Sequence, residues 1–220
     1  MKKKIVTLCL VAALAVTAIG GTLAYFTDKT QVTTNTFTVG NVNIELDEAV
    51  VDVYGEDQGT RSAEGNEYKL IPGHTYTKDP MVTVKPGTEK SYIRMLVTFN
   101  MSDEVESILG PNFLPENFVG GWVPETWVST GVVEKDEDAK TLTYEFRYYT
   151  TVENLTTSDL ELDELFETFT LPADLTNNEV KELNGLNISV VAHAIQADGL
   201  TEAEAWTAFD ANPTLDEDMQ

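Results

Sequence analysis

The chain has 220 residues, 42% of them hydrophobic, and carries 14 Lys and Arg against 37 Asp and Glu, a formal net charge of −23. This excess of acidic residues would repel a phosphate backbone, which excludes nucleic acid as a partner. The single cysteine, Cys9, lies near the N-terminus, so the fold cannot be held by disulfides within the chain and must depend on a hydrophobic core.

Residues 1–24 have the pattern of an export signal. Three lysines precede an apolar stretch over residues 5–19, which is too short to hold a membrane span. The small residues Thr22 and Ala24 occupy the −3 and −1 positions of a cleavage site, which places the cut before Tyr25. Cleavage there would change the formal net charge from −23 to −26 and leave no stable membrane span. An uncleaved N-terminal anchor is the alternative.

Strand patterns dominate the remaining chain. Alternating runs rich in Val, Thr and aromatic residues predict strands at 31–39, 42–46, 49–54, 68–71, 81–84, 91–100, 127–134, 141–149 and 186–197. A polar, Gly-rich segment at 55–66 predicts a loop, and the charged residues 135–140 predict a hairpin turn.

Three capping boxes predict short helices in the connections between strands. They begin at Ser158, Thr176 and Thr201, each followed three residues later by a glutamate. Many short strands with few helices predict an all-β sandwich that forms a single domain over residues 25–220. Residues 211–220 are expected to form a flexible acidic tail.

No residue pattern predicts catalysis. The chain has two histidines, His74 and His193, and no pair of them at the spacing of a metal site. Acidic clusters at 136–138 and 216–218 are candidates for loose calcium binding, but neither matches an EF-hand loop, and solvated acidic segments are the simpler interpretation. The sequence therefore predicts no catalytic residues, no metal centre and no other cofactor.

Trp122 and Trp127 lie in an aromatic stretch interrupted by Pro and Gly. Aromatic platforms of this kind bind glycans or protein partners at a surface, but loops that cap the end of a sandwich also bury such residues. The capping interpretation is favoured over the surface interpretation.

The segment that follows the predicted cut is a candidate for pairing with another molecule. A mature N-terminal segment over residues 25–40 would contain a strand with free backbone groups, able to complete its own sheet or that of a neighbour. Head-to-tail addition of that kind does not close and makes a filament. The donor strand is expected to be formed by Gln31, Val32, Thr34, Thr36, Phe37 and Val39, with Phe37 and Val39 filling pockets.

The same junction resembles the processing site of the TasA/camelysin family of exported proteins. "GGTLAYFTDKT" matches its pattern of small residues, an aromatic pair and an acid, and "NTFTVGNVNIEL" resembles the run that follows. "LIPGHTYTKDPMVTVKPGTEKSYIRMLVTF" and "AHAIQADGL" resemble its Pro-Gly turn with following strands and its closing strand. The similarity covers residues 20–46, 70–99 and 190–200, whereas 101–185 cannot be aligned.

This resemblance implies a jelly-roll-like β-sandwich that is cleaved by a dedicated SipW-type signal peptidase and secreted to the extracellular matrix or cell surface. It further implies biofilm fibres made by donor-strand exchange, with the chain itself and other matrix proteins as partners. Two alternatives stay open. One is a metallo-endopeptidase, since the camelysin branch is labelled a casein-cleaving metalloprotease. The other is a monomeric surface module that binds glycans or proteins.

Overall fold

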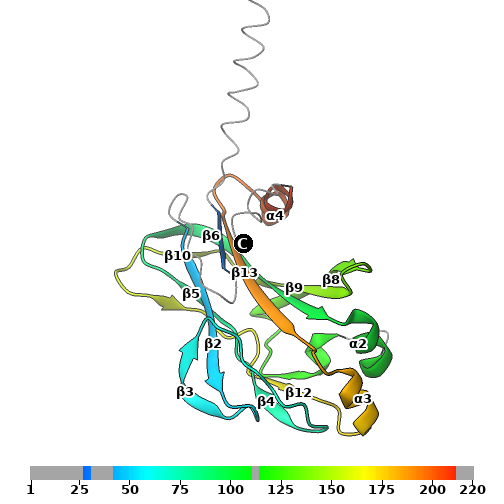
Figure 1. The fold of residues 1–220 in the computed structure, drawn as a ribbon. Helices are drawn as coiled ribbons and strands as arrows, with labels where there is room; N and C mark the ends of the chain where they lie inside the picture. Colours follow the sequence, from blue (N-terminus) through cyan, green and yellow to red (C-terminus); the bar gives the residue numbers. More distant parts are fainter. Residues whose placement is uncertain (1–26, 31–41, 111–113, 212–220) are drawn as a thin grey trace, which may run out of the picture.

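Two antiparallel sheets pack face to face and enclose the main core (Figure 1). The computed structural model describes residues 27–30, 42–110 and 114–211. Every strand pairing in these parts of the chain is antiparallel. The predicted all-β sandwich with few short helices is therefore confirmed.

The larger sheet has the strand order β1-β13-β6-β9-β8, and β10 also pairs with β6. Its strands are β1 (Thr27–Thr30), β6 (Thr88–Asn100), β8 (Trp127–Asp136), β9 (Thr141–Tyr148), β10 (Val152–Asn154) and β13 (Ile188–Gln196). The long strand β6 lies in the centre of this sheet and pairs with three neighbours, so it organises the sheet from sequence segments that are far apart.

The facing sheet has the order β11-β5-β2-β3, and a small third sheet has the order β4-β12-β7. Their strands are β2 (Ile44–Val51), β3 (Asp57–Ser62), β4 (Thr75–Thr77), β5 (Met81–Val84), β7 (Val119–Gly120), β11 (Leu160–Glu161) and β12 (Thr168–Thr170). The third sheet closes one end of the sandwich, where Tyr76, Phe169 and Leu171 form a small core of their own.

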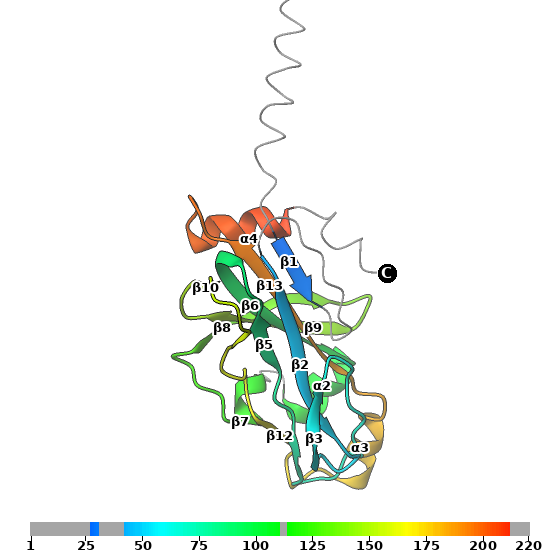
Figure 2. The same ribbon diagram turned by 90° about the vertical axis from the view of Figure 1, so that its left-hand side faces the viewer.

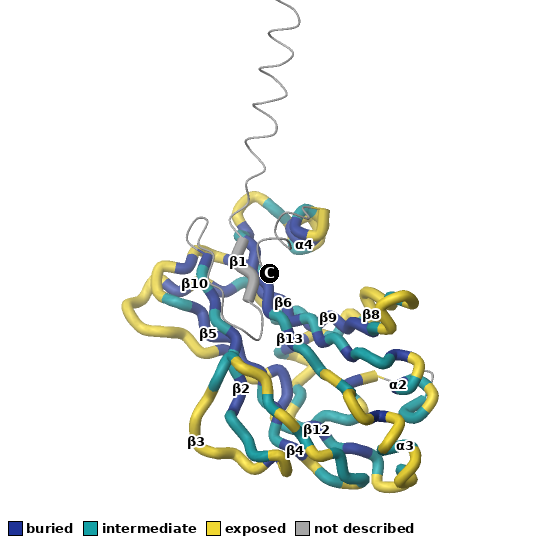
Figure 3. The backbone as a smooth tube through the Cα atoms, viewed as in Figure 1, coloured by how far each residue is buried: buried dark blue, intermediate teal, exposed yellow. Residues whose placement is uncertain are grey.

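Alternation along the strands builds the main core, because successive side chains of a strand point to opposite faces. The inward residues of the larger sheet are Ile93, Met95, Val97 and Phe99 of β6, Leu142, Tyr144 and Phe146 of β9, and Val190, Ala192 and Ala194 of β13. They pack against Ile44 and Leu46 of β2 and Val82 and Val84 of β5. Figure 3 shows buried residues along these strands and exposed residues on β3 and α3 (Asn177–Glu182).

Helix α4 (Glu202–Asp210) covers the outer face of the larger sheet over β13 and β6 (Figure 2). The guanidinium of Arg94 lies 4.5 Å from the ring centroid of Trp206, and its Nη1 donates to Asp210 at 3.2 Å. The Arg94 Nε also donates to Nδ1 of His193, at 3.1 Å. These contacts fix α4 to the segment of β13 that pairs with β1.

Two of the three predicted helices are present with complete capping boxes, α3 after Thr176 and α4 after Thr201. The prediction of a helix after Ser158 is wrong. That segment contains β11 and β12 instead, although its apolar residues Leu162, Leu165 and Phe166 are buried as expected. These apolar residues are buried because the segment runs in extended form along the margin of the sandwich, where β11 pairs with β5 and β12 pairs with β4. A capping box in the sequence gives no information about such pairing.

Several further elements were not predicted. The segment expected to be a loop at 55–66 contains β3, which is largely exposed and pairs with β2. Helix α2 (Ser102–Leu109) follows β6, and the 3₁₀ turn η1 (Pro115–Asn117) precedes β7. Among the described residues, no helix has the length and apolar content needed to cross a bilayer.

The irregular segment between β11 and β12 provides a test of the core. Leu165 is completely buried, so Leu165→Ala should lower the free energy of unfolding by about 2–5 kcal/mol, measured by urea denaturation. Leu155 is 70% exposed, and Leu155→Ala should change the same free energy by less than about 0.5 kcal/mol. Equal losses for the two variants would contradict the placement of Leu165 in the core.

Candidate functional site

The outer edge of β13 is the place where the N-terminal segment meets the sandwich (Figure 2). Strand β1 pairs antiparallel with β13, from Thr27 opposite Ile195 to Thr30 opposite Ala192. On its other side, β13 pairs with β6 along its whole length. Within the described parts of the chain, residues 188–191 therefore have β6 as their strand partner and none on the outer edge.

A cavity of about 1050 Å³ lies beside the first three of these residues, 188–190. It is bordered by β13 on one side and by Leu46–Glu48 of β2 on the other, and it reaches the loops around α3. Its apolar walls are formed by Leu46, Tyr68, Leu70, Tyr76, Phe169, Leu183, Leu186, Ile188 and Val190. We call this cavity the flank groove, because it follows the side of the sandwich between the edges of β2 and β13.

A buried phenol, Tyr76, and a half-buried one, Tyr68, line one end of the flank groove. The hydroxyl of Tyr68 donates to the Thr77 carbonyl at 3.0 Å, and that of Tyr76 donates to the Lys69 carbonyl at 2.7 Å. Burial raises the pKa of Tyr76, and burial together with the negative charge of Glu48 raises that of Tyr68. Both phenols therefore stay protonated well into the alkaline range.

A buried ion pair between Lys78 and Glu48 forms one polar part of the groove wall. Lys78 Nζ lies 2.7 Å from Glu48 Oε2, and both side chains are over 90% buried. Asn66 Nδ2 donates to the other Glu48 oxygen at 3.0 Å and to the Ala49 carbonyl at 2.8 Å. The pair has its charges compensated within the wall, so it shapes the groove and presents no uncompensated charge to a ligand.

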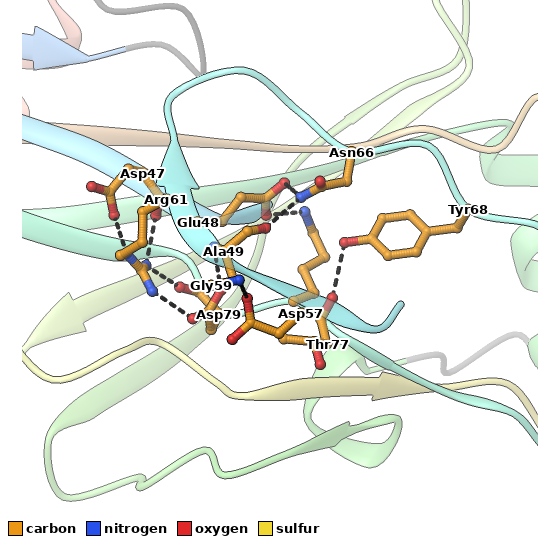
Figure 4. Close-up of polar contacts among 11 residues, drawn as sticks. Asp47, Glu48, Ala49, Asp57, Gly59, Arg61, Asn66, Tyr68, Thr77 and Asp79 are labelled. Atoms are coloured by element: carbon orange, nitrogen blue, oxygen red, sulfur yellow. Dashed lines mark hydrogen bonds and ion pairs between the residues drawn. The ribbon is translucent and has the colours of Figure 1, made fainter. Parts of the chain in front are cut away.

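A second ion cluster fixes β2 to the start of β5 from the outside (Figure 4). Arg61 of β3 contacts Asp47 at 2.7 Å and Asp79 at 2.6 Å. Asp79 also accepts a hydrogen bond from the Ala49 backbone N–H, at 2.7 Å. This cluster holds the β2 border of the flank groove in a defined position.

The residues of the predicted cleavage site and donor strand lie outside the described residues. This applies to Thr22, Ala24, Tyr25, Gln31, Val32, Thr34, Thr36, Phe37 and Val39, and also to the predicted tail from residue 212 onward. The described portion of the predicted segment 25–40 is β1, which lies directly before the predicted donor strand.

The two tryptophans proposed as a surface pack into the molecule. Trp127 is completely buried, and its Nε1 donates to the Asp163 carbonyl at 2.9 Å. Trp122 is partly buried, donates to the Trp127 carbonyl at 2.8 Å, and packs edge-on against Phe146. The Trp127 ring, at the start of β8, thus has no exposed face for a sugar.

The donor groups of a metal site are not brought together. Among the described residues, no three His, Cys, Asp or Glu side chains form a group that could hold a metal ion. His74 Nε2 donates to the Tyr54 carbonyl at 2.7 Å. His193 Nδ1 accepts a hydrogen bond from Arg94 Nε beneath α4. In the acidic turn, Asp136 Oδ1 accepts from the backbone N–H groups of Asp138 and Ala139, both at 2.8 Å.

Sequence reasoning missed the flank groove and its ion pair. Glu48 and Lys78 are separated by 30 positions, and nothing in either local pattern indicates that they meet. The sequence offers one signal of the ion pair, which is the position of Lys78 just before the apolar strand 81–84. A charged side chain that is buried beside such a strand requires a partner of opposite charge.

The buried pair predicts an asymmetric mutational response. Lys78→Met should lower the free energy of unfolding by about 3–5 kcal/mol, because it leaves the Glu48 carboxylate buried without its cation. The double variant Lys78→Met/Glu48→Leu should lose less than the single one, as measured by chemical denaturation. Lys140→Met removes an exposed pair with Asp103 and should cost no more than about 1 kcal/mol. A double variant less stable than Lys78→Met would contradict this account.

Comparison with known proteins gives one match. The family model described as camelysin metallo-endopeptidase matches residues 1–60, a region that includes β1, β2 and the beginning of β3. No curated protein and no solved structure is significantly similar to the chain. The match confirms the predicted resemblance to the TasA/camelysin family over residues 1–60.

Proposed function

We propose that this protein is a secreted structural subunit of the extracellular or biofilm matrix that assembles into fibres through its N-terminal strand. In this proposal a SipW-type signal peptidase cuts before Tyr25 and frees the segment 25–40. That segment then exchanges from its own sheet to the sheet of the next subunit. The observation that carries the proposal is the pairing of β1 with the outer edge of β13. Strand β1 begins at Thr27, so two residues separate it from the predicted cut.

The size of β1 favours exchange. A strand of four residues at the edge of a sheet contributes few backbone hydrogen bonds and little buried surface, so its opening costs little free energy. The same backbone bonds form whether the strand comes from the same chain or from a neighbour. The number of backbone hydrogen bonds therefore changes little on exchange, as in domain swapping.

The geometry also gives the assembly a direction. The donating segment and the β13 edge are different surfaces of one chain, so the contact between two copies is heterologous. Each added subunit would present a new β13 edge or a new free segment. Such a contact extends into a filament unless its rotation closes a ring.

The matched family's name supports a second candidate, a metallo-endopeptidase. The described residues do not fit such a site, because they contain no suitable ligand group and each histidine has a partner in the fold. Proteolysis of casein by the purified protein, lost with a chelator and restored by zinc, would establish this activity. The structural proposal predicts no cleavage under any of these conditions.

Truncation tests the structural proposal. The form beginning at Tyr25 should make filaments visible by electron microscopy, and the form beginning at Gly40, which lacks β1, should stay monomeric in light scattering. Circular dichroism should show both forms folded, because the main core lies within residues 42–211. Two folded forms that are equally monomeric at pH 4–8, with and without calcium, would contradict fibre assembly.

Charge should control the rate of assembly. A mature chain of net charge −26 repels its copies, and salt or protonated carboxylates weaken that repulsion. Assembly of the Tyr25 form, followed by light scattering, should therefore accelerate from low salt to about 0.5 M NaCl and from pH 8 towards pH 4, near the ordinary pKa of Asp and Glu. Assembly slowed by salt would contradict electrostatic control.

A further inference from the structure

We propose that the side chains of Lys78 and Asn66 become joined by an amide bond within the chain. The Lys78 amine attacks the Asn66 carboxamide, and Glu48 acts as the catalytic acid and base. The reaction is a self-catalysed covalent modification in the wall of the flank groove, where all three residues lie. It is independent of the proposed assembly, because every reacting group belongs to one chain.

One carboxylate brings the two reacting groups together. Glu48 Oε2 contacts Lys78 Nζ at 2.7 Å, and Glu48 Oε1 accepts a hydrogen bond from Asn66 Nδ2 at 3.0 Å, which Figure 4 shows. Glu48 belongs to β2, Asn66 to the loop after β3, and Lys78 to the segment between β4 and β5. The fold thus holds an amine and an amide on the two oxygens of one acid–base group, which removes the entropic cost of an encounter.

The carboxamide of Asn66 is oriented for attack. Its Oδ1 accepts a hydrogen bond from the Val51 backbone N–H at 2.9 Å, and its Nδ2 also donates to the Ala49 carbonyl at 2.8 Å. During attack, negative charge develops on Oδ1, where the Val51 N–H stabilises it as a donor of an oxyanion hole does. The nitrogen that must leave is the atom that faces the Glu48 carboxylate.

Burial assists the first proton transfer. The side chains of Lys78 and Glu48 are 8% and 6% exposed. A proton that moves from Nζ to Oε2 across their contact converts two charged groups into two neutral ones, which lose less solvation on burial. The transfer is therefore less costly here than between the same groups in water, and it leaves the amine with the lone pair that a nucleophile needs.

The reaction balances within these groups. After the first proton transfer, the lone pair of Nζ forms a bond to Cγ of Asn66. The bond from Cγ to Nδ2 then breaks, while Glu48 gives a proton to Nδ2 and takes another from Nζ. Ammonia leaves and carries the remaining proton away as ammonium, so Glu48 ends as the carboxylate that it was at the start.

The bond supplies a covalent lock to a chain whose single cysteine lies in the predicted export signal. It closes residues 66–78 into a covalent loop that contains β4, the strand that pairs with β12. A cross-link of this kind stabilises a fold mainly by restricting the unfolded chain. The modification thereby fixes the third sheet and the β2 border of the flank groove to each other.

Intact mass and peptide mapping of the purified folded protein test the bond. The protein should weigh about 17 Da less than its sequence predicts, because one ammonia is lost. Trypsin should leave the chain uncut after Lys78 and release residues 62–69 joined to residues 70–90, since Lys85 precedes proline. The branched peptide distinguishes this bond from closure of Asn66 onto its own backbone. A folded protein of full mass, or one without the branched peptide, would overturn the proposal.

Substitutions test the role of Glu48. Glu48→Gln keeps the size of the side chain but removes the acid–base group, so it should slow bond formation at least about a hundredfold and leave the freshly purified chain at its full mass. Lys181→Met is the matched control, because Lys181 also lines the groove, and it should keep the loss of ammonia.

Circular dichroism establishes whether the Glu48→Gln chain is folded. A folded Glu48→Gln chain that carries the branched peptide to the same extent as the unsubstituted chain would overturn the catalytic role. If this variant does not fold, the mass and the peptide map of the unsubstituted chain still decide whether the bond exists. Because neither readout requires filaments, failure of this proposal and failure of the proposed function are separate results.

Discussion

Backbone hydrogen bonding along the outer edge of β13 is the constraint on which this structure depends. Donors and acceptors at a strand edge need partners, and an unprotected edge pairs with any available strand. Here β1 pairs with residues 192–195, and the flank groove lies beside residues 188–190. The rest of the fold holds that edge in place: β6 pairs with it from the inside, and α4 fixes its outer face through Arg94 and His193.

In this acidic protein, buried charged side chains lie beside side chains of opposite charge. The buried carboxylate of Glu48 is paired with Lys78, and the cations at the outer faces, such as Arg61, connect neighbouring segments. The remaining acidic residues lie largely in water, where their charge opposes unregulated association. In the proposed assembly, the same charge would make association respond to salt and pH.

Alternation predicted most of the sandwich, because β5, β6, β9 and β13 bury one or both faces in a regular pattern. The pattern failed where tertiary pairing determines the structure. Polar β3 is a strand only because β2 lies beside it, and the segment after Ser158 buries its apolar residues without forming a helix. The sequence indicated the N-terminal segment 25–40 as a candidate for strand pairing. It did not indicate the flank groove, because the groove combines β2, β13 and the loops near α3, and no local signal shows that these parts meet.

Binding of an isolated donor peptide to an acceptor without its own donor tests the central claim most directly. We would add a peptide of residues 25–39 to the ¹⁵N-labelled form beginning at Gly40 and record backbone amide shifts by NMR. The account predicts saturable changes concentrated in residues 192–195 of β13, which pair with β1 within the chain. Absence of binding, or shifts centred on another face such as β8, would contradict it.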